Sequence, residues 1–182
     1  EFDEDGETVI VAGTFSKSFS PGIRVGWGIL PKHLAGPVGD LKSNIDFGSP
    51  NLNQHVMAEV LQRDLFDEHV LALRRSYKKK LDAMLDAAEE FLRPIEGVSW
   101  HQPTGGLYVW ATLPDHIDPG PSGELFDRAI AEGMLYVPGH YCFASEGESV
   151  KRNTMRLSFG VQSCDGIRRG MEALARAIQA VV

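Results

Sequence analysis

The sequence predicts an α/β chain in two parts: the remainder of a mostly parallel sheet, and then a smaller α+β unit. The first observation is a nearly continuous apolar run at residues 8–13, which is typical of a strand covered on both faces. The second is a long helical stripe in the middle of the chain. The third is a series of short alternating segments after residue 97, separated by two helical patterns.

The first part contains too few strands for a stable sheet. The segment TVIVAG at residues 8–13 and the segment VGWGIL at 25–30, which ends at Pro31, are the two predicted strands. Two strands alone rarely form a stable sheet, so we expect their neighbours to lie before residue 1 or in another molecule. Residues 31–42 are expected to be helical only in short pieces, and residues 44–53 to form an irregular loop.

The middle of the chain predicts two helices. One covers residues 54–63, and a longer one, which Asp64 can cap, ends before Pro94 and Gly97. Apolar residues recur along the longer helix in steps of three and four. They are Phe66, Val70, Leu73, Tyr77, Leu81, Met84, Ala88 and Phe91. The basic run at residues 78–80 is interpreted as the solvated side of this helix rather than a nucleic-acid contact.

The last part predicts alternating strands and helices. Strands are expected at residues 98–102, 106–113, 134–139 and 154–161. A helix capped by Ser122 is expected over residues 122–133, and a final helix begins near Ser163. We therefore divide the chain into residues 1–53, two connecting helices at 54–92, and a C-terminal domain at 93–182.

Composition excludes several classes of function. A net charge of −7 and a pI of about 5.3 argue against a nucleic-acid surface. There is no apolar run of the roughly 18 residues that a membrane span needs, and no recognisable signal peptide. Cys142 and Cys164 show no CxxC spacing, and the histidines lack metal-ligand spacing, so we predict free thiols, no metal and a cytoplasmic location. The first residue is Glu1, and we expect a fragment, a processed product or a chain whose true start lies upstream.

The segment TFSKSFSPGIRVGW at residues 14–27 carries the chemistry of the first part. A neutral lysine amine such as that of Lys17 attacks carbonyls and forms Schiff bases. Thr14 and Ser16 place hydroxyls beside it, and Arg24 offers a guanidinium suited to a phosphate. The turn at residues 20–22 lets the chain double back toward the lysine. An exposed loop lysine with a salt-bridged arginine is the alternative from the residues alone.

This segment resembles the lysine signature of fold-type-I aminotransferases that depend on pyridoxal 5′-phosphate (PLP), especially the 2-aminoadipate and kynurenine aminotransferase subgroup. The resemblance implies that Lys17 holds the cofactor as an aldimine and moves a proton between the substrate α-carbon and the cofactor. It implies that Thr14, Ser16 and Arg24 bind the cofactor phosphate. Thr14 stands where serine is common in the family, and it keeps the hydroxyl.

Further motifs follow in the family's order. SPNLNQ (49–54) resembles the segment before the interdomain helix, and PTGGLYVWATLP (103–114) resembles a strand of the small domain. VPGHYCF (137–143) resembles a turn of that domain, and NTMRLSFG (153–160) the strand whose arginine binds the substrate carboxylate. The resemblance implies that residues 1–53 end a large PLP-binding domain and that residues 93–182 form the small domain.

Arg156 can also be placed by the alternation of its strand. Met155, Leu157, Phe159 and Val161 share one face of it, and Arg156 shares the other with Ser158 and Gly160. The arginine therefore points away from the apolar layer, toward solvent or a cleft. The resemblance favours a clamp for the substrate carboxylate over an ordinary exposed arginine.

The resemblance implies an enzyme that moves an amino group between an L-amino acid and a 2-oxo acid, normally as a homodimer. The family's other cofactor contacts, above all an aspartate on the ring nitrogen, have no counterpart in these residues. We therefore predict that this chain alone is inactive. Two alternatives stay open: the effector domain of a MocR-type transcriptional regulator, with a winged-helix domain upstream, and another fold-type-I enzyme such as a lyase, a decarboxylase or an aminocyclopropane-carboxylate synthase.

Overall fold

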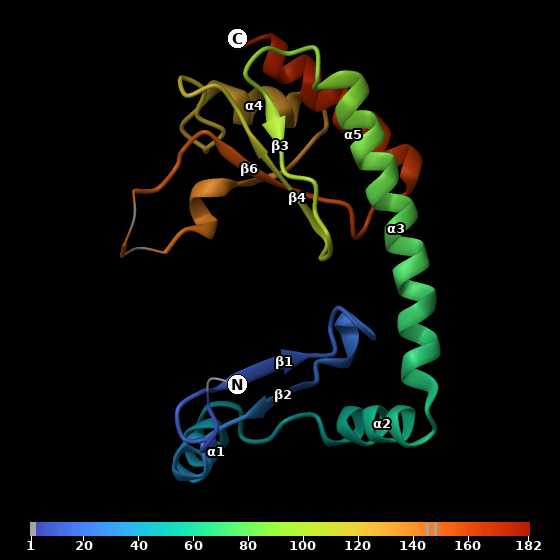
Figure 1. The fold of residues 1–182 in the computed structure, drawn as a ribbon, viewed down its shortest axis with the longest axis vertical. Coiled ribbons are helices and arrows are strands. Elements are labelled where there is room, and N and C mark those ends of the chain that lie inside the picture. The colour runs from blue at the N-terminus through green and yellow to red at the C-terminus, as the bar shows by residue number, and fades with distance from the viewer. Residues whose placement is uncertain (1–2, 145, 148) are drawn as a thin grey trace. The chain divides into compact units, whose positions relative to one another are not determined.

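A computed structural model describes residues 3–144, 146, 147 and 149–182 of the chain. The chain forms two units, Glu1–Arg74 and Arg75–Val182, which are described separately below (Figure 1). The boundary falls within the longest helix. In the described part of the chain, no helix combines the length and the apolar composition that crossing a bilayer requires.

The first unit opens with a β-hairpin. Strand β1 (Val11–Thr14) runs antiparallel to β2 (Gly26–Ile29), and a short 3-10 helix, η1 (Pro21–Ile23), lies between them. Val11 pairs with Ile29 and Thr14 with Gly26. Val11 and Ile29 are 44% and 63% exposed although they are apolar. The two predicted strands are thus present, and their apolar side chains are not covered within this unit.

Helix α1 (Lys32–Asp46) corrects the expectation of short helical pieces, because it is continuous over 15 residues. Pro37 lies in its second turn, where proline removes one backbone hydrogen bond and crowds the carbonyl four residues earlier, and the helix nevertheless continues through it. The helix ends at Phe47, which adopts a left-handed conformation (φ 52°) and donates its amide to the Ser43 carbonyl over 3.1 Å. The irregular loop therefore covers residues 47–50 and not 44–53.

Two further helices follow. Helix α2 (Asn51–Gln62) begins three residues earlier than predicted, and α3 (Leu65–Phe91) covers 27 residues. Asp64 has a φ of 55° and donates its amide to the Leu61 carbonyl, so it ends α2 directly before α3. The predicted apolar stripe of α3 is confirmed: its members are half-buried or buried, and Met84 and Ala88 lie in the core of the second unit.

The second unit is built on an antiparallel four-stranded sheet in the order β3-β4-β6-β5. Its strands are β3 (Ser99–Trp100), β4 (Tyr108–Thr112), β5 (Val137–Pro138) and β6 (Thr154–Ser158). In the central pair, Val109 is opposite Leu157 and Trp110 is opposite Arg156. The four predicted strands are present but shorter than expected, and Val161 lies beyond the end of β6 and is 89% exposed.

The helices of this unit are α4 (Glu124–Ala131) and α5 (Cys164–Gln179), with a short 3-10 helix, η2 (Gly139–Cys142), after β5. The predicted cap of α4 is wrong: Gly123 occupies the cap position, with an extended backbone and no capping side chain. The predicted cap of α5 is confirmed, because the Ser163 hydroxyl accepts from the Gly166 amide over 3.1 Å.

The core lies between one face of this sheet and the helices α3, α4 and α5. Strand residues Val109, Ala111, Met155 and Leu157 are each at most 1% exposed. They form one cluster with buried side chains of the three helices, namely Met84, Ala87, Ala88, Leu125, Ala129, Ile167, Met171, Leu174 and Ile178. Since side chains alternate along a strand, Tyr108, Trp110 and Arg156 lie on the opposite face.

Candidate active site

Lys17 lies in the loop that joins β1 and β2. The amide of Phe15 donates to the Val25 carbonyl over 3.1 Å, which closes the end of the hairpin. The amides of Phe19 and Ser20 both donate to the Phe15 carbonyl, over 2.8 and 3.1 Å. The backbone around Lys17 thus makes one helical turn, and the lysine side chain is exposed.

The hydroxyl and guanidinium groups that the sequence singled out lie together beside this turn. The Thr14 hydroxyl donates to the Ser16 hydroxyl over 3.0 Å and accepts from the Ser16 amide over 3.1 Å. Arg24 Nη1 donates to the Ser16 hydroxyl over 3.3 Å. The structure therefore brings Thr14, Ser16 and Arg24 into contact, next in sequence to Lys17.

A strained backbone aims Arg24 at this cluster. Arg24 is left-handed, with φ 51° and ψ 37°, a conformation that costs an L-residue about 1–2 kcal/mol. The turn before it is held by the Ser20 hydroxyl, which accepts from the Gly22 amide over 3.3 Å. Arg24 Nη1 also donates to the Pro21 carbonyl over 3.0 Å. As predicted, the turn doubles the chain back, so that the guanidinium reaches the residue before Lys17.

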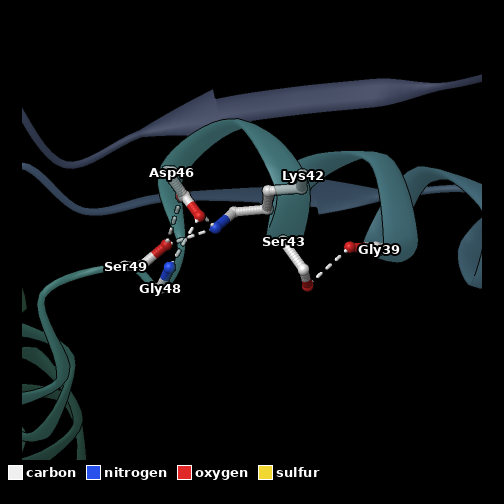
Figure 2. Close-up of polar contacts among 6 residues, drawn as sticks. All are labelled: Gly39, Lys42, Ser43, Asp46, Gly48 and Ser49. Atoms are coloured by element: carbon white, nitrogen blue, oxygen red, sulfur yellow. Dashed lines mark hydrogen bonds and ion pairs between the residues drawn. The ribbon is translucent and has the colours of Figure 1, made fainter.

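A polar cluster at the end of α1 fixes the loop over residues 47–50 (Figure 2). Lys42 Nζ donates to Asp46 Oδ2 over 2.6 Å and also hydrogen-bonds the Ser49 hydroxyl. The Gly48 amide donates to Asp46 Oδ1 over 3.0 Å. The hydrogen bond from Lys42, followed by that from Gly48, lowers the pKa of Asp46.

This cluster borders a hollow of about 380 Å³ that Arg24 also lines. The ion pair with Asp46 balances the charge of Lys42. Arg24 forms no ion pair within the described part of the chain, and its side chain donates hydrogen bonds to a hydroxyl and a carbonyl. Of the two cations around the hollow, Arg24 is therefore the better one to attract an anion.

Arg156 lies in the other unit, on β6 between Trp110 of β4 and Val137 of β5. Its guanidinium carbon stands 4.3 Å from the centroid of the Tyr108 ring. Its Nε is buried without a hydrogen-bond partner, and Arg156 makes no ion pair among the described residues. A half-buried cation that rests on an aromatic face and lacks a carboxylate partner can bind an anionic group from outside.

The donor set of the first unit fits a phosphorylated aldehyde. Two hydroxyls and a planar guanidinium suit the oxygens of a phosphate dianion. The exposed amine of Lys17 can reach a carbonyl carbon. In the described part of the chain, no group of three or more histidine, cysteine or acidic side chains is placed to hold a metal ion.

The fold and this lysine loop define a class of protein that comparison with known families identifies. Residues 1–174 match the family "Aminotransferase class I and II", and the chain belongs to this family. It is 37% identical over 178 residues to an aromatic-amino-acid aminotransferase of Thermococcus litoralis. The match covers 98% of this chain and 40% of that protein.

A solved structure agrees with this assignment. The chain resembles the α-aminoadipate aminotransferase LysN of Thermus thermophilus, solved with N-(5′-phosphopyridoxyl)-L-leucine, with a TM-score of 0.84 and 34% identity. The match covers 96% of this chain and 43% of that protein. The chain thus spans less than half the length of these two relatives.

Regulators are also among the relatives. The chain is 32% identical over 173 residues to YisV of Bacillus subtilis, an uncharacterised transcriptional regulator of the helix-turn-helix type. That match covers 95% of this chain and 34% of the regulator. The same fold therefore occurs in proteins named as enzymes and in proteins named as regulators.

Three side chains that contact Arg156 or the Lys17 loop were not predicted from the sequence. Tyr108 could have been found as a neighbour of Arg156 only with the register of β4 against β6. Asn53 and His69 each donate to a carbonyl of the Lys17 loop, but they stand 36 and 52 residues after Lys17. Asn53 lies in the segment SPNLNQ, which did not indicate this contact, and His69 belongs to no motif. The sequence carried only a weak signal for the last two contacts, namely a polar residue on a helix that has one buried face.

Proposed function

We propose that this chain acts as the C-terminal part of a PLP-dependent aminotransferase, which moves an amino group between an L-amino acid and a 2-oxo acid. The observation that carries the proposal is the contact of Arg24 and Thr14 with Ser16, directly beside the exposed Lys17. Membership of the aminotransferase family supports the reaction class. The phosphopyridoxyl compound bound by the related LysN supports the choice of cofactor.

In this proposal the lysine loop holds both ends of the cofactor. Arg24, Ser16 and Thr14 would bind the phosphate, since a guanidinium and hydroxyls match its oxygens. Lys17 would bind the aldehyde through its amine and later move a proton at the substrate α-carbon. The bound cofactor supplies an electron sink for the electrons left at that carbon.

Arg156 would bind the carboxylate of the amino acid. Its strand places the guanidinium on the face opposite the core, and the Tyr108 ring supports it there. A carboxylate accepts two parallel N–H bonds from one guanidinium, so this contact would orient the substrate as well as hold it. This role for Arg156 is supported by the lack of a carboxylate partner for its guanidinium among the described residues.

The proposal also assigns a domain to each part of the chain. Residues 1–53 would complete the large cofactor-binding domain, residues 54–92 would connect the domains, and residues 93–182 would form the small domain. We place the whole enzyme in the cytoplasm as a homodimer. Ile45, Phe47 and Leu52 around the α1–α2 loop are apolar and 81%, 93% and 74% exposed. This supports the proposal that other parts of the complete homodimer cover these side chains.

Reductive labelling of the complete enzyme tests the lysine. The protein is incubated with PLP and amino acid-free buffer, reduced with borohydride, and digested for peptide mapping. The label should appear on the peptide that contains Lys17, and Lys17→Ala should remove it. Lys79→Ala, which changes another exposed lysine, is the matched control and should leave the label in place. A label spread evenly over many lysines would contradict the proposal.

The isolated 182-residue chain should not transfer amino groups at a useful rate. In this proposal the aspartate that keeps the cofactor ring nitrogen protonated would come from outside these 182 residues, and without that proton the ring is a poorer electron sink. The assay follows conversion of a 2-oxo acid to an amino acid by the purified chain with added PLP. Sustained turnover would show that this chain holds a complete active site.

A regulatory role is the second candidate, favoured by the similarity to YisV over 95% of the chain. In that case the aminotransferase-like part would bind a ligand and a separate domain would bind DNA. The two functions are separated by assaying the complete protein for amino-group transfer and for ligand-dependent DNA binding. Turnover without DNA binding supports the enzyme, and DNA binding without turnover supports the regulator. Release of carbon dioxide or another elimination product would instead indicate a sister enzyme.

A further inference from the structure

Side chains of two helices, α2 and α3, contact the Lys17 loop. Phe66 of α3 packs edge-on against Phe15, with ring centroids 5.7 Å apart at 89°. His69, one turn further along α3, tilts against Phe19 with centroids 5.2 Å apart. Both aromatic contacts thus reach the short helical turn that carries Lys17, and both come from the N-terminal part of α3.

His69 also bonds to the backbone of this turn. Its Nε2 lies 3.1 Å from the Phe19 carbonyl oxygen, and the contact is partly buried. A carbonyl can only accept a hydrogen bond, so Nε2 of His69 carries the proton and donates. The Phe19 carbonyl belongs to the turn closed by the Phe19 and Ser20 amides on the Phe15 carbonyl, and that turn spans Lys17.

The other end of the loop has its own support. Asn53 of α2 donates through Nδ2 to the Ile23 carbonyl over 2.9 Å. Ile23 directly precedes Arg24, and its amide donates to the Ser20 carbonyl over 3.3 Å. The loop is therefore held at its arginine end by α2 and at its lysine end by α3, through two unrelated side chains.

We propose that His69 is a positioning residue for Lys17: its Nε2–H fixes the backbone turn that presents the lysine amine to the cofactor aldehyde. The inference rests on the proposed function, because only a lysine that binds the cofactor aldehyde needs its backbone turn held in one position. His69 does not contact the reacting atoms and acts through the Phe19 carbonyl. Asn53 would do the same for Arg24 at the phosphate end.

Hydrogen exchange of the loop amides in the full chain tests the contact without any cofactor. His69→Phe keeps an aromatic ring against Phe19 but removes the donor. The amides of Phe19 and Ser20 should then exchange about two- to tenfold faster, which is the effect of one net hydrogen bond. His69→Gln retains an N–H donor of similar reach and should restore most of the protection.

Two controls make the effect specific to one end of the loop. Asn53→Ala should accelerate exchange of the Ile23 amide and leave that of Phe19 unchanged. His55→Phe removes an exposed histidine of α2 and should change neither amide. Equal protection of Phe19 and Ser20 in wild type and His69→Phe would overturn the inference, as would a loss in His69→Phe that His69→Gln does not restore.

The labelling experiment separates this inference from the proposed function. In the complete enzyme, His69→Phe should lower the share of borohydride-fixed PLP found at Lys17 about two- to tenfold, and His69→Gln should recover it. If wild type carries no label at Lys17, the proposed function fails, and the exchange data still judge the contact. If wild type is labelled at Lys17 and His69→Phe is labelled equally, the positioning role alone fails.

Discussion

The guanidinium carbon of Arg156 lies 4.3 Å from the centroid of the Tyr108 ring, on the face of the second unit's sheet opposite the buried Leu157. Tyr108 pairs with Ser158, two residues beyond Arg156, so the two side chains are diagonal neighbours on adjacent strands. The ring therefore supports the cation in the structure, and in the proposed function this would reduce the entropy that binding of a carboxylate must overcome.

Removing the ring should weaken substrate binding without affecting the cofactor. A cation–π contact contributes about 0.5–2 kcal/mol, so Tyr108→Leu in the complete enzyme should weaken amino-acid binding roughly two- to thirtyfold. Tyr108→Phe keeps the ring and should bind nearly as wild type. Dissociation constants from the change in cofactor absorbance give the comparison. If leucine and phenylalanine variants bind equally, the ring does not support Arg156.

Removing Arg156 should have a larger effect on the same equilibrium. Hydrogen bonds to a charged group contribute about 1.5–3 kcal/mol, so Arg156→Ala should weaken amino-acid binding roughly ten- to a hundredfold. Titration of the protein with PLP should give an unchanged affinity, because the proposed phosphate ligands lie at Thr14, Ser16 and Arg24. Equal losses of amino-acid and PLP affinity would exclude a specific carboxylate role.

The sequence predicted the strands and helices well where one residue type or one period dominates. The apolar stripe of α3 and the alternation along β6 follow directly from periodicity. The stripe was correct, and the alternation was correct within Thr154–Ser158 but not at Val161, which lies beyond the strand and is exposed. The errors occurred where proline and glycine suggested breaks, as in α1, which runs through Pro37. Proline fits the first helical position without cost, but further along it removes one hydrogen bond and crowds the preceding turn, so it disfavours a helix without excluding one.

The lysine loop could be predicted because all its parts lie within a few residues of one another. The motif contains Thr14, Ser16, Lys17 and the turn that returns Arg24, so local geometry determines their contact. Tyr108, Asn53 and His69 could not be predicted, because their contacts depend on strand register and on helices distant in sequence. Long-range contacts of this kind require a three-dimensional structure.

Arg24 should be sensitive to the shape of its side chain and not just to its charge. Arg24→Lys keeps the charge but loses the planar fork, so PLP affinity should fall, though less than in Arg24→Ala. For the alanine variant we expect a loss of about 1.5–3 kcal/mol, or roughly ten- to a hundredfold. Equilibrium dialysis of the complete enzyme measures it.

Arg63→Ala is the matched control for Arg24, since Arg63 is an exposed arginine directly after α2 that pairs with Glu59. Its PLP affinity should equal that of wild type. An Arg24→Lys variant with unchanged affinity would show that a point charge suffices. An unchanged Arg24→Ala variant would remove Arg24 from the phosphate site.

The Asp46 cluster should make the loop over residues 47–50 sensitive to acid. The pKa of Asp46 is lowered in the folded chain, chiefly by the hydrogen bond from Lys42. A carboxyl group with a lowered folded-state pKa stabilises the fold above its ordinary pKa of about 4, and this stabilisation is lost as the pH falls through the folded value. Asp46→Asn should therefore destabilise the loop at pH 7 and have no effect in strong acid.

Exchange of the Gly48 amide, which donates to Asp46 Oδ1, gives a local measurement of this effect. At neutral pH the amide should exchange faster in Asp46→Asn than in wild type, and the two rates should converge as the pH falls below about 4, after correction for intrinsic exchange. Asp40→Asn alters an exposed carboxylate of the same helix outside the cluster in Figure 2 and should match wild type throughout. A difference between Asp46→Asn and wild type that persists unchanged into strong acid would mean that shape rather than charge holds the loop.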